Sequence, residues 1–306
     1  MATVPTREFI MQTITPNLWF NGDAAEAAEF YADAFPHGRV VSTVHYPTEN
    51  LPDFQKEMAG KPLAVDVDLG GLVITLINAG PEFPINPAIS FMLNFDPLVE
   101  DDARGSLDRL WAALSAGGQE LMALGEYPFS ARYGWVQDRY GVNWQLMMTN
   151  PGGEQRPFVI PSLMFCGAAQ NRAAEAREFY TSVFPSSRTG TVAEYPEQTG
   201  PASAGAVMFS DFMLENQWFA AMDSGAEQDF SFTEGVSLAV ACEDQAEIDR
   251  LWEALSSVPE AEQCGWCKDR FGVSWQIVPA NMADLMQRPD AYQKMLAMTK
   301  IEIDGF

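Results

Sequence analysis

Apolar and polar positions in residues 13–78 follow the order strand, helix, strand, strand, strand. The apolar residues of segment 24–34 recur at the spacing of one helical face, and Asp23 stands before them as a candidate N-cap. The remaining apolar segments are short and bounded by turn residues, as strands are. They cover residues 13–20, 39–45, 63–69 and 72–78. Together these elements make one βαβββ unit.

The same order restarts at residue 89. The pattern predicts a strand at 89–95 and a helix at 102–115, in which Leu107, Leu110 and Leu114 share one face. Further strands are predicted at 120–124, 131–137 and 142–148. The first 150 residues therefore contain two βαβββ units.

A twelve-residue motif shows that this pair of units is itself duplicated. Residues 134–145 read GWVQDRYGVNWQ and residues 265–276 read GWCKDRFGVSWQ, with eight identical positions at a constant offset of 131. Asp66 recurs as Asp211 and Ser90 recurs as Ser237, at offsets that drift by a few residues, as loop insertions and deletions produce. We interpret the chain as a tandem duplication with four βαβββ units.

The copies are separated by a polar stretch rich in Pro and Gly at residues 150–157. We predict a first domain at residues 1–150, a linker at 151–157 and a second domain at 158–306. Segment 282–298 is predicted to be a helical tail of the second domain, and it has no counterpart in the first copy.

A paired βαβββ unit that ends in Asp-Arg-x-Gly-x-x-Trp-Gln resembles the vicinal oxygen chelate superfamily of glyoxalases and bleomycin-resistance proteins. The nearest resemblance is to its PhnB-like branch, which is labelled demethylubiquinone methyltransferase-like, and it covers roughly residues 13–279. Segments ITP at 14–16 and FPINPAIS at 83–90 also carry it. The resemblance implies an α+β fold with two glyoxalase-like domains. In each, two βαβββ units form a curved mixed-sheet cup around a small molecule, often at a metal.

The resemblance also indicates where metal-using members carry their ligands. The matching positions here are Gln145 and Gln276 on the last strands, Ser90 and Ser237 on the fifth strands, and Asn17 and Ser162 near the first strands. Neutral amides and hydroxyls are a weak donor set for a divalent ion, which prefers imidazole, thiolate or carboxylate. We therefore predict no metal.

The methyltransferase label implies S-adenosylmethionine, which doubly wound folds bind at a glycine-rich turn after the first strand. Here the corresponding turns are Asn21-Gly22-Asp23 and Cys166-Gly167-Ala168, and neither has that pattern. We predict no cofactor.

Alternation along the last strand places Asn143 and Gln145 on one face and Trp144 on the other, and the second copy repeats this pattern. By the family geometry the glutamine face is turned into the cup, and Trp144 belongs to the core. Each glutamine can bind a ligand or satisfy buried backbone groups, and both alternatives stay open. The candidate ligand-binding residues are Asn17, Ser90, Trp135, Asn143, Gln145, Ser162, Ser237, Trp266, Ser274 and Gln276.

The composition of the chain excludes some classes of binding partner. Forty-two acidic residues against 18 basic ones give a net charge of −24, which disfavours nucleic acid and anionic membrane surfaces. Residues 1–8 lack the apolar core of a signal peptide, so we expect a cytoplasmic protein. Cys264 and Cys267 have the spacing of a redox pair, but the first copy has Tyr133 and Val136 in their place, so buried free cysteines are expected.

These observations favour a metal-independent small-molecule-binding protein of the glyoxalase superfamily, and they leave open whether it is an enzyme. One alternative is a metal-dependent lyase or dioxygenase of the same superfamily, with ligands from other positions. Another is a non-catalytic module that sequesters a drug or metabolite. The expected partner is a small-molecule ligand, and the fused copies fit either a homodimer or an internally paired monomer.

Overall fold

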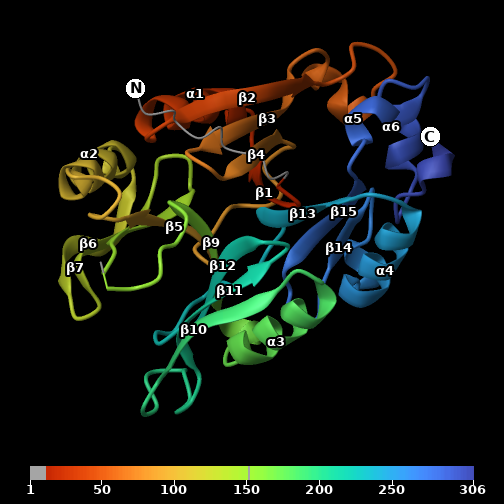
Figure 1. Cartoon of the computed structure of the whole chain (residues 1–306). Coiled ribbons are helices and arrows are strands. Elements are labelled where there is room, and N and C mark those ends of the chain that lie inside the picture. The colour runs from red at the N-terminus through yellow and green to blue at the C-terminus, as the bar shows by residue number, and fades with distance from the viewer. Residues whose placement is uncertain (1–11, 151) are drawn as a thin grey trace, which may run out of the picture.

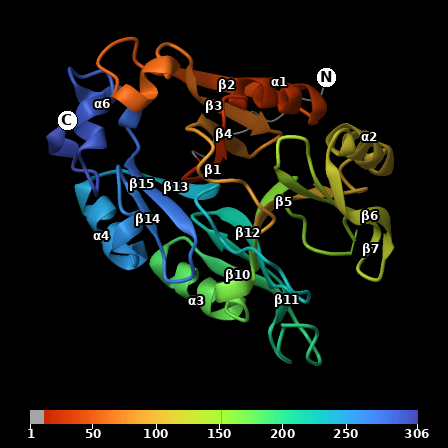
Figure 2. The same ribbon diagram turned by 180° about the vertical axis from the view of Figure 1, so that it is seen from behind.

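The computed structural model describes residues 12–150 and 152–306, which form two mixed sheets with helices around them (Figures 1 and 2). Residues 1–8, on which the expected cytoplasmic location partly depends, lie outside the described residues. The first copy contains β1 (Ile14–Phe20), α1 (Ala24–Ala34), β2 (Gly38–His45), β3 (Pro62–Leu69), β4 (Val73–Asn78), β5 (Ile89–Phe95), α2 (Ala103–Ser115), β6 (Gln119–Tyr127), β7 (Ser130–Gln137) and β8 (Asn143–Met148).

The second copy repeats these elements, with one strand fewer in its last unit as far as the structure describes it. It contains β9 (Val159–Phe165), α3 (Ala173–Val183), β10 (Arg188–Glu194), β11 (Val207–Leu214), β12 (Gln217–Asp223), β13 (Val236–Cys242), α4 (Gln245–Leu255), β14 (Trp266–Lys268) and β15 (Ser274–Pro279). The prediction of a fourth complete βαβββ unit was therefore wrong. The segment between α4 and β14 is about ten residues shorter than its counterpart in the first copy, which leaves no room for a strand equivalent to β6.

Each sheet takes one unit from each copy. Sheet A has the order β14-β15-β13-β1-β4-β3-β2, and sheet B has the order β10-β11-β12-β9-β5-β8-β7-β6. The sheets are completed by two equivalent antiparallel pairs, β1 with β13 and β5 with β9. The α+β tandem duplication is thus confirmed, with one refinement: the two units that share a curved sheet come from different copies. In the first copy, Pro81, Pro84 and Pro87 favour an extended connection that leads the chain from sheet A to sheet B.

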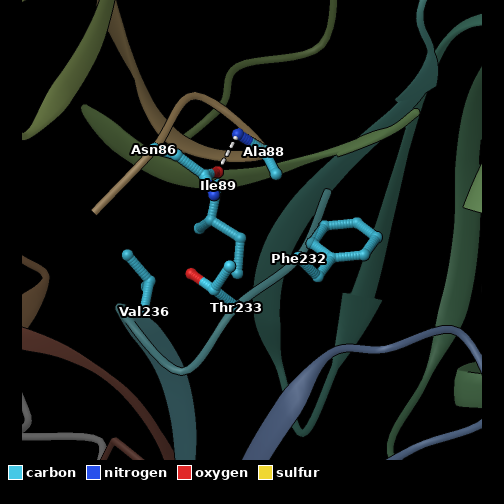
Figure 3. Close-up of a pocket in the computed structure, with 6 residues that line it drawn as sticks. All are labelled: Asn86, Ala88, Ile89, Phe232, Thr233 and Val236. Atoms are coloured by element: carbon cyan, nitrogen blue, oxygen red, sulfur yellow. Dashed lines mark hydrogen bonds between the residues drawn. The ribbon is translucent and has the colours of Figure 1, made fainter. Parts of the chain in front are cut away.

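The seam between the sheets has pseudo-twofold symmetry. Asn86 Nδ2 donates to the carbonyl of Ser231, and the equivalent Thr233 hydroxyl donates to the carbonyl of Pro84. A shallow depression lies at this seam, and Figure 3 shows that Ile89 and its equivalent Val236 lie near each other among the residues that line it. These reciprocal bonds link the connectors that lead into β5 and β13, so they help to set how the two copies meet.

Two buried aspartates join the sheets on their helical side. Asp138, before β8 of sheet B, accepts from the Tyr31 hydroxyl of α1 (2.7 Å) and from Trp144 Nε1 (2.8 Å). Its other oxygen accepts from the backbone amides of Tyr140 and Val142. Asp269 has the same four kinds of partner in the second copy. The aspartates of the two Asp-Arg turns therefore have a structural role.

Helix α1 begins with a cap from a distant residue. Asp23 occupies the N-cap position but its side chain makes no capping hydrogen bond, so that prediction was wrong. Instead Asn78 Oδ1, at the end of β4, accepts from the amides of Gly22 and Ala24 (3.0 Å each). Asp223 accepts from the amide of Ala173 at the equivalent start of α3.

The helical tail predicted for 282–298 is confirmed as two short helices, α5 (Met282–Leu285) and α6 (Ala291–Leu296). Pro289 cannot continue α5, and Asp290 has a left-handed φ of 58°. Beyond α6, the carbonyls of Met298 and Thr299 accept from the amides of Cys264 and Gly265, next to β14. The tail therefore lies beside the edge of sheet A at which the strand equivalent to β6 is missing.

We expect Asp138→Asn and Asp269→Asn each to lower the free energy of unfolding by about 3 kcal/mol, because an amide leaves buried donors without an acceptor. Equilibrium urea unfolding, followed by tryptophan fluorescence, measures the change. Asp101→Asn, the same substitution at an exposed carboxylate, serves as the control. Equal stability of the Asp101 and Asp138 variants would contradict the assigned role.

Candidate functional site

The ten predicted site residues fall into two equivalent groups, one on each sheet. Both groups lie on the face opposite the helices, called the helix-free face here, because the alternate residues Leu18, Leu238 and Trp275 belong to the core under the helices. Site 1, on sheet A, comprises Asn17, Ser237, Trp266, Ser274 and Gln276. Site 2, on sheet B, comprises Ser90, Trp135, Asn143, Gln145 and Ser162. The grouping follows the sheets and not the copies, since Asn17 lies beside Ser237 and Ser162 beside Ser90.

Each glutamine is held by a serine on the neighbouring strand. Gln276 Nε2 donates to Ser237 Oγ (2.9 Å), and Gln145 Nε2 donates to Ser90 Oγ (2.8 Å). Neither of these bonds goes to the backbone. The amide groups are thereby fixed in orientation, and each oxygen Oε1 is left to accept from another group.

Four buried polar atoms at equivalent places have no hydrogen-bond partner in the described part of the chain. In site 1 they are Asn17 Oδ1 and Ser274 Oγ, and in site 2 they are Ser162 Oγ and Asn143 Oδ1. Asn17 is equivalent to Ser162, and Ser274 to Asn143, so each site has one unpaired amide oxygen and one unpaired hydroxyl, and site 2 has the unpaired donor Trp135 Nε1 in addition. Burying such groups without a partner costs about 1–3 kcal/mol each. Groups of this kind are expected where a partner comes from outside the chain.

A row of polar side chains crosses sheet A through site 1. Strand register places Asn17 opposite Ser237 on one side and Thr75 on the other, and continues in both directions. The complete row is Lys268, Ser274, Ser237, Asn17, Thr75, Asp66 and Ser42.

The carboxylate in this row was not among the predicted site residues. Asp66 accepts from the hydroxyls of Thr75 (2.7 Å) and Ser42 (2.6 Å). No role was predicted for Thr75. Only the strand register, which places Thr75 between Asn17 and Asp66, shows that it belongs to this row.

The two sites differ at the glutamine oxygen. In site 2 the Tyr133 hydroxyl donates to Gln145 Oε1 (2.7 Å), and burial raises the pKa of Tyr133 well above its ordinary value, so the hydroxyl stays protonated. In site 1 the residue equivalent to Tyr133 is Cys264, and no donor from residues 12–150 or 152–306 reaches Gln276 Oε1. The difference between Tyr133 and Cys264 at equivalent positions is the sequence feature that could have identified Tyr133 as a partner of Gln145.

The tryptophans beside the glutamines also differ in exposure. Trp135 is 9% exposed and packs with Tyr133 and Met164. Trp266 is half-buried and meets Trp19 edge to face, with ring centroids 5.9 Å apart. Trp19 is held in turn by a bond from its Nε1 to the carbonyl of Gly80 (2.8 Å). Site 1 therefore has an aromatic wall that solvent reaches, whereas the aromatic groups of site 2 are buried.

The donor atoms of both sites do not fit a divalent metal. The residues at the family's ligand positions offer only amide and hydroxyl oxygens, whereas zinc and its relatives prefer nitrogen, sulfur or carboxylate donors. In the part of the chain that the structure describes, no group of three or more His, Cys, Asp or Glu residues is placed to hold a metal ion.

Cys264 and Cys267 do not form a pair. Cys264 lies in the turn before β14 with a left-handed φ of 54°, whereas Cys267 lies under the helices in the core. All four cysteines are free. Burial raises the pKa of Cys166 to about 11 and those of Cys242 and Cys267 to about 12, so these thiols are unreactive at neutral pH.

A cavity of about 300 Å³ elsewhere lies between α4 and the tail, and four of its seven lining residues are acidic. It contains none of the predicted site residues, and neither does the depression at the seam. Within the described residues, no helix is long and apolar enough to span a membrane.

Residues 12–147 and 157–278 each match the family described as 3-demethylubiquinone-9 3-methyltransferase. The PhnB protein from Bacillus cereus is 31% identical over 45% of this chain and 100% of its own, with a TM-score of 0.39. Protein PA1353 from Pseudomonas aeruginosa is 25% identical over 44% of this chain and 94% of its own, with a TM-score of 0.36. Glyoxalase I from Zea mays is 11% identical over 94% of this chain and 98% of its own, and its TM-score of 0.52 shows a shared fold. No functionally curated protein matches the chain.

We expect N-ethylmaleimide at pH 8 to modify at most one thiol per native chain, that of the half-buried Cys264, because the raised pKa values of the other three leave little thiolate. Mass spectrometry of the intact chain, before and after denaturation in urea, counts the labels. The Cys264→Ser variant should take up none in the native state. Rapid native labelling of Cys267, or a disulfide between it and Cys264, would contradict the assignment.

Proposed function

We propose that this chain, which belongs to the 3-demethylubiquinone-9 3-methyltransferase family, is a small-molecule-binding protein that holds its ligand without a metal ion. The membership and the glyoxalase-like fold confirm the resemblance inferred from the repeated motif. The proposed site is the helix-free face of a sheet, around a fixed glutamine. The observation that carries the proposal is the set of unpaired buried oxygens beside Gln145 and Gln276.

Direct hydrogen bonding to the ligand is supported by the chemistry of these groups. An unpaired hydroxyl or amide oxygen destabilises the free protein, and a ligand that satisfies it recovers that energy on binding. The neighbouring Gln–Ser pair is already fixed, so little conformational entropy is lost when a ligand arrives. A buried polar group surrounded by apolar and aromatic side chains is the usual composition of a small-molecule site.

Neither cofactor that the family suggests enters this proposal. The neutral donors do not fit a metal ion, for the reasons given above. S-adenosylmethionine would need free amides at the start of the first helix of a copy, and those of Gly22 and Ala24 already donate to Asn78. The equivalent amide of Ala173 donates to Asp223. We therefore assign the chain no methyl-transfer step.

Binding without turnover is favoured by the state of the charged residues in the row of sheet A. Asp66 already accepts hydrogen bonds from two hydroxyls, and Lys268 Nζ lies 2.6 Å from Glu234 Oε1. Both groups are engaged within the protein, so neither is poised to move a proton to or from a ligand. The free thiols further support a cytoplasmic location, where cysteines stay reduced.

The first test is metal content together with ligand binding. We expect elemental analysis to find less than about a tenth of an equivalent of transition metal per chain, because the donor set is neutral. A library of small molecules is then screened by thermal unfolding in the presence of EDTA. Compounds that raise the midpoint should bind at least about tenfold more weakly to Gln276→Ala or Gln145→Ala, since one such hydrogen bond contributes roughly 1 kcal/mol or more. A tightly held equivalent of metal, or a library without hits, would overturn the proposal.

A second test uses stability alone. We expect Ser274→Ala to leave the free energy of unfolding unchanged or to raise it by up to about 1 kcal/mol, because it removes a buried hydroxyl without a partner. Ser237→Ala, the same substitution on the neighbouring strand, should lower it by about 1 kcal/mol because Gln276 loses its acceptor. Urea unfolding compares the two. A loss of similar size in both variants would show that Ser274 is paired in the free protein.

A further inference from the structure

We infer that site 1, and not site 2, takes the ligand, and that this ligand is a flat aromatic molecule, neutral or cationic, that carries hydrogen-bond donors. The inference rests on the proposed function, because that function does not distinguish the two sites and the inference selects one of them. It follows from side-chain size, from the free acceptors of site 1 and from the exposure of its aromatic wall.

The first observation is the size of the side chains around each glutamine. Five positions on the helix-free face of sheet B have smaller equivalents on the helix-free face of sheet A. In the order site 2 then site 1, the pairs are Tyr133 and Cys264, Met147 and Val278, Met92 and Ala239, Ile160 and Thr15, and Trp218 and Val73. These changes remove volume beside the glutamine and along the three strands that follow it across the sheet.

Site 2 is packed by its own side chains. Met92, Ile160 and Trp218 form one buried cluster on this face, with Met147 against it. Tyr133 and Trp135 form another with Met164. The Tyr133 hydroxyl already occupies the free oxygen of Gln145. A ligand here would have to displace well-packed apolar groups, which costs several kcal/mol.

Site 1 is open at the matching positions. Ala239 and Ala241 lie in the middle of sheet A, yet both are partly exposed, whereas their equivalents Met92 and Asn94 are buried. Two methyl groups in the centre of a sheet leave a flat floor. Gln276 is 8% exposed against 2% for Gln145.

The polar groups of site 1 define what the ligand must carry. Gln276 Oε1 and Asn17 Oδ1 are acceptors without a partner among the described residues, and Ser274 Oγ can serve as one. A matching ligand therefore presents N–H or O–H groups. The row's one cation, Lys268, is neutralised by Glu234, and the whole chain has a net charge of −24, so an anionic ligand is disfavoured.

The aromatic wall defines the shape of the ligand. Trp19 and Trp266 meet edge to face, and Phe83 packs against Trp19 with ring centroids 4.9 Å apart. Both tryptophans are partly exposed. A flat aromatic ring can stack on such a surface, and a cationic one gains further from the face of an indole.

The C-terminal tail bridges the two edges of sheet A. Its carbonyls at Met298 and Thr299 bind the turn before β14, at one edge. Its helix α6 reaches the segment after β2, at the other edge, where the Tyr292 hydroxyl donates to Gln55 Oε1 (2.9 Å). Figure 1 shows α5 and α6 between these two parts of the chain. The tail has no counterpart in the first copy, so these contacts are made at sheet A and not at sheet B.

The test uses 2-naphthol, a flat neutral probe with one donor and its own fluorescence. We expect isothermal titration to give one equivalent per chain. The matched probe 2-methoxynaphthalene, which lacks the donor, and 2-naphthoate, which is an anion, should each bind at least about tenfold more weakly, as expected for one lost hydrogen bond or a repelled charge. Two equivalents per chain, or equal binding of all three probes, would overturn the inference. Absence of 2-naphthol binding at millimolar concentration would overturn the ligand class.

Two opposite substitutions at equivalent positions assign the site. Ala239→Met fills the floor of site 1 and should weaken 2-naphthol binding at least tenfold, whereas Met92→Ala, in site 2, should leave the first binding event unchanged. Thr15→Ile fills site 1 from the neighbouring strand and should also weaken binding. It provides an independent test in case the Ala239 variant does not fold. Circular dichroism checks that all three variants fold.

Loss of binding in the Met92 variant, with none in the Ala239 and Thr15 variants, would move the ligand to site 2. That outcome would leave the proposed function intact, since that function is overturned only by a tightly held equivalent of metal or by a library without hits.

Discussion

The buried carboxylates of Asp138 and Asp269 fix the two sheets of this chain relative to each other. Each receives a tyrosine hydroxyl from a helix that packs on one sheet and an indole N–H from a strand of the other. Burial raises the pKa of both carboxyls, and the four hydrogen bonds on each act against that shift and stabilise the charged form. A partner missing from this arrangement would leave a polar group unpaired in the core, so the geometry admits little variation.

Asp138 and Asp269 bind their partners on the helical side of the sheets. The side chains on the opposite faces are therefore little constrained by these hydrogen bonds. The core under the helices is nearly the same in both copies: Trp144 and Trp275 are completely buried, as are Tyr31 and Tyr180 to within 1%. On the helix-free faces, by contrast, Trp218 is equivalent to Val73 and Met92 to Ala239. A shared frame thus supports two surfaces of different chemistry, and the difference between the surfaces is where function is to be sought.

Much of this architecture was predictable from local pattern, and what was missed depends on contacts between distant segments. The alternation on the last strands correctly placed Gln145 and Gln276 opposite the buried tryptophans, because strand geometry fixes which side chains share a face. It gave no indication that Asn17 lies beside Ser237 and not beside Ser90, since strand pairing across the copies is set by the connectors and the seam. The cap of α1 was missed for the same reason: Asn78, 54 residues from Ala24, accepts from the backbone amides of Gly22 and Ala24, whereas the Asp23 side chain makes no capping hydrogen bond. The shortened segment before β14 was visible in the sequence, because the residue-number offset between equivalent positions of the two copies falls from 141 to 131 there.

The same pair of side chains, glutamine and serine, therefore has different hydrogen-bond partners on each sheet. On sheet B, Tyr133 completes the hydrogen bonding of Gln145, and the amide becomes part of an apolar core. On sheet A the equivalent residue is Cys264, and no donor from the described residues reaches Gln276 Oε1. This oxygen is not among the buried atoms that lack a partner, so it is accessible to water, which a donor from outside the chain can replace. One tyrosine thus separates two amides that differ in their hydrogen bonding, although the strands that carry them are built alike.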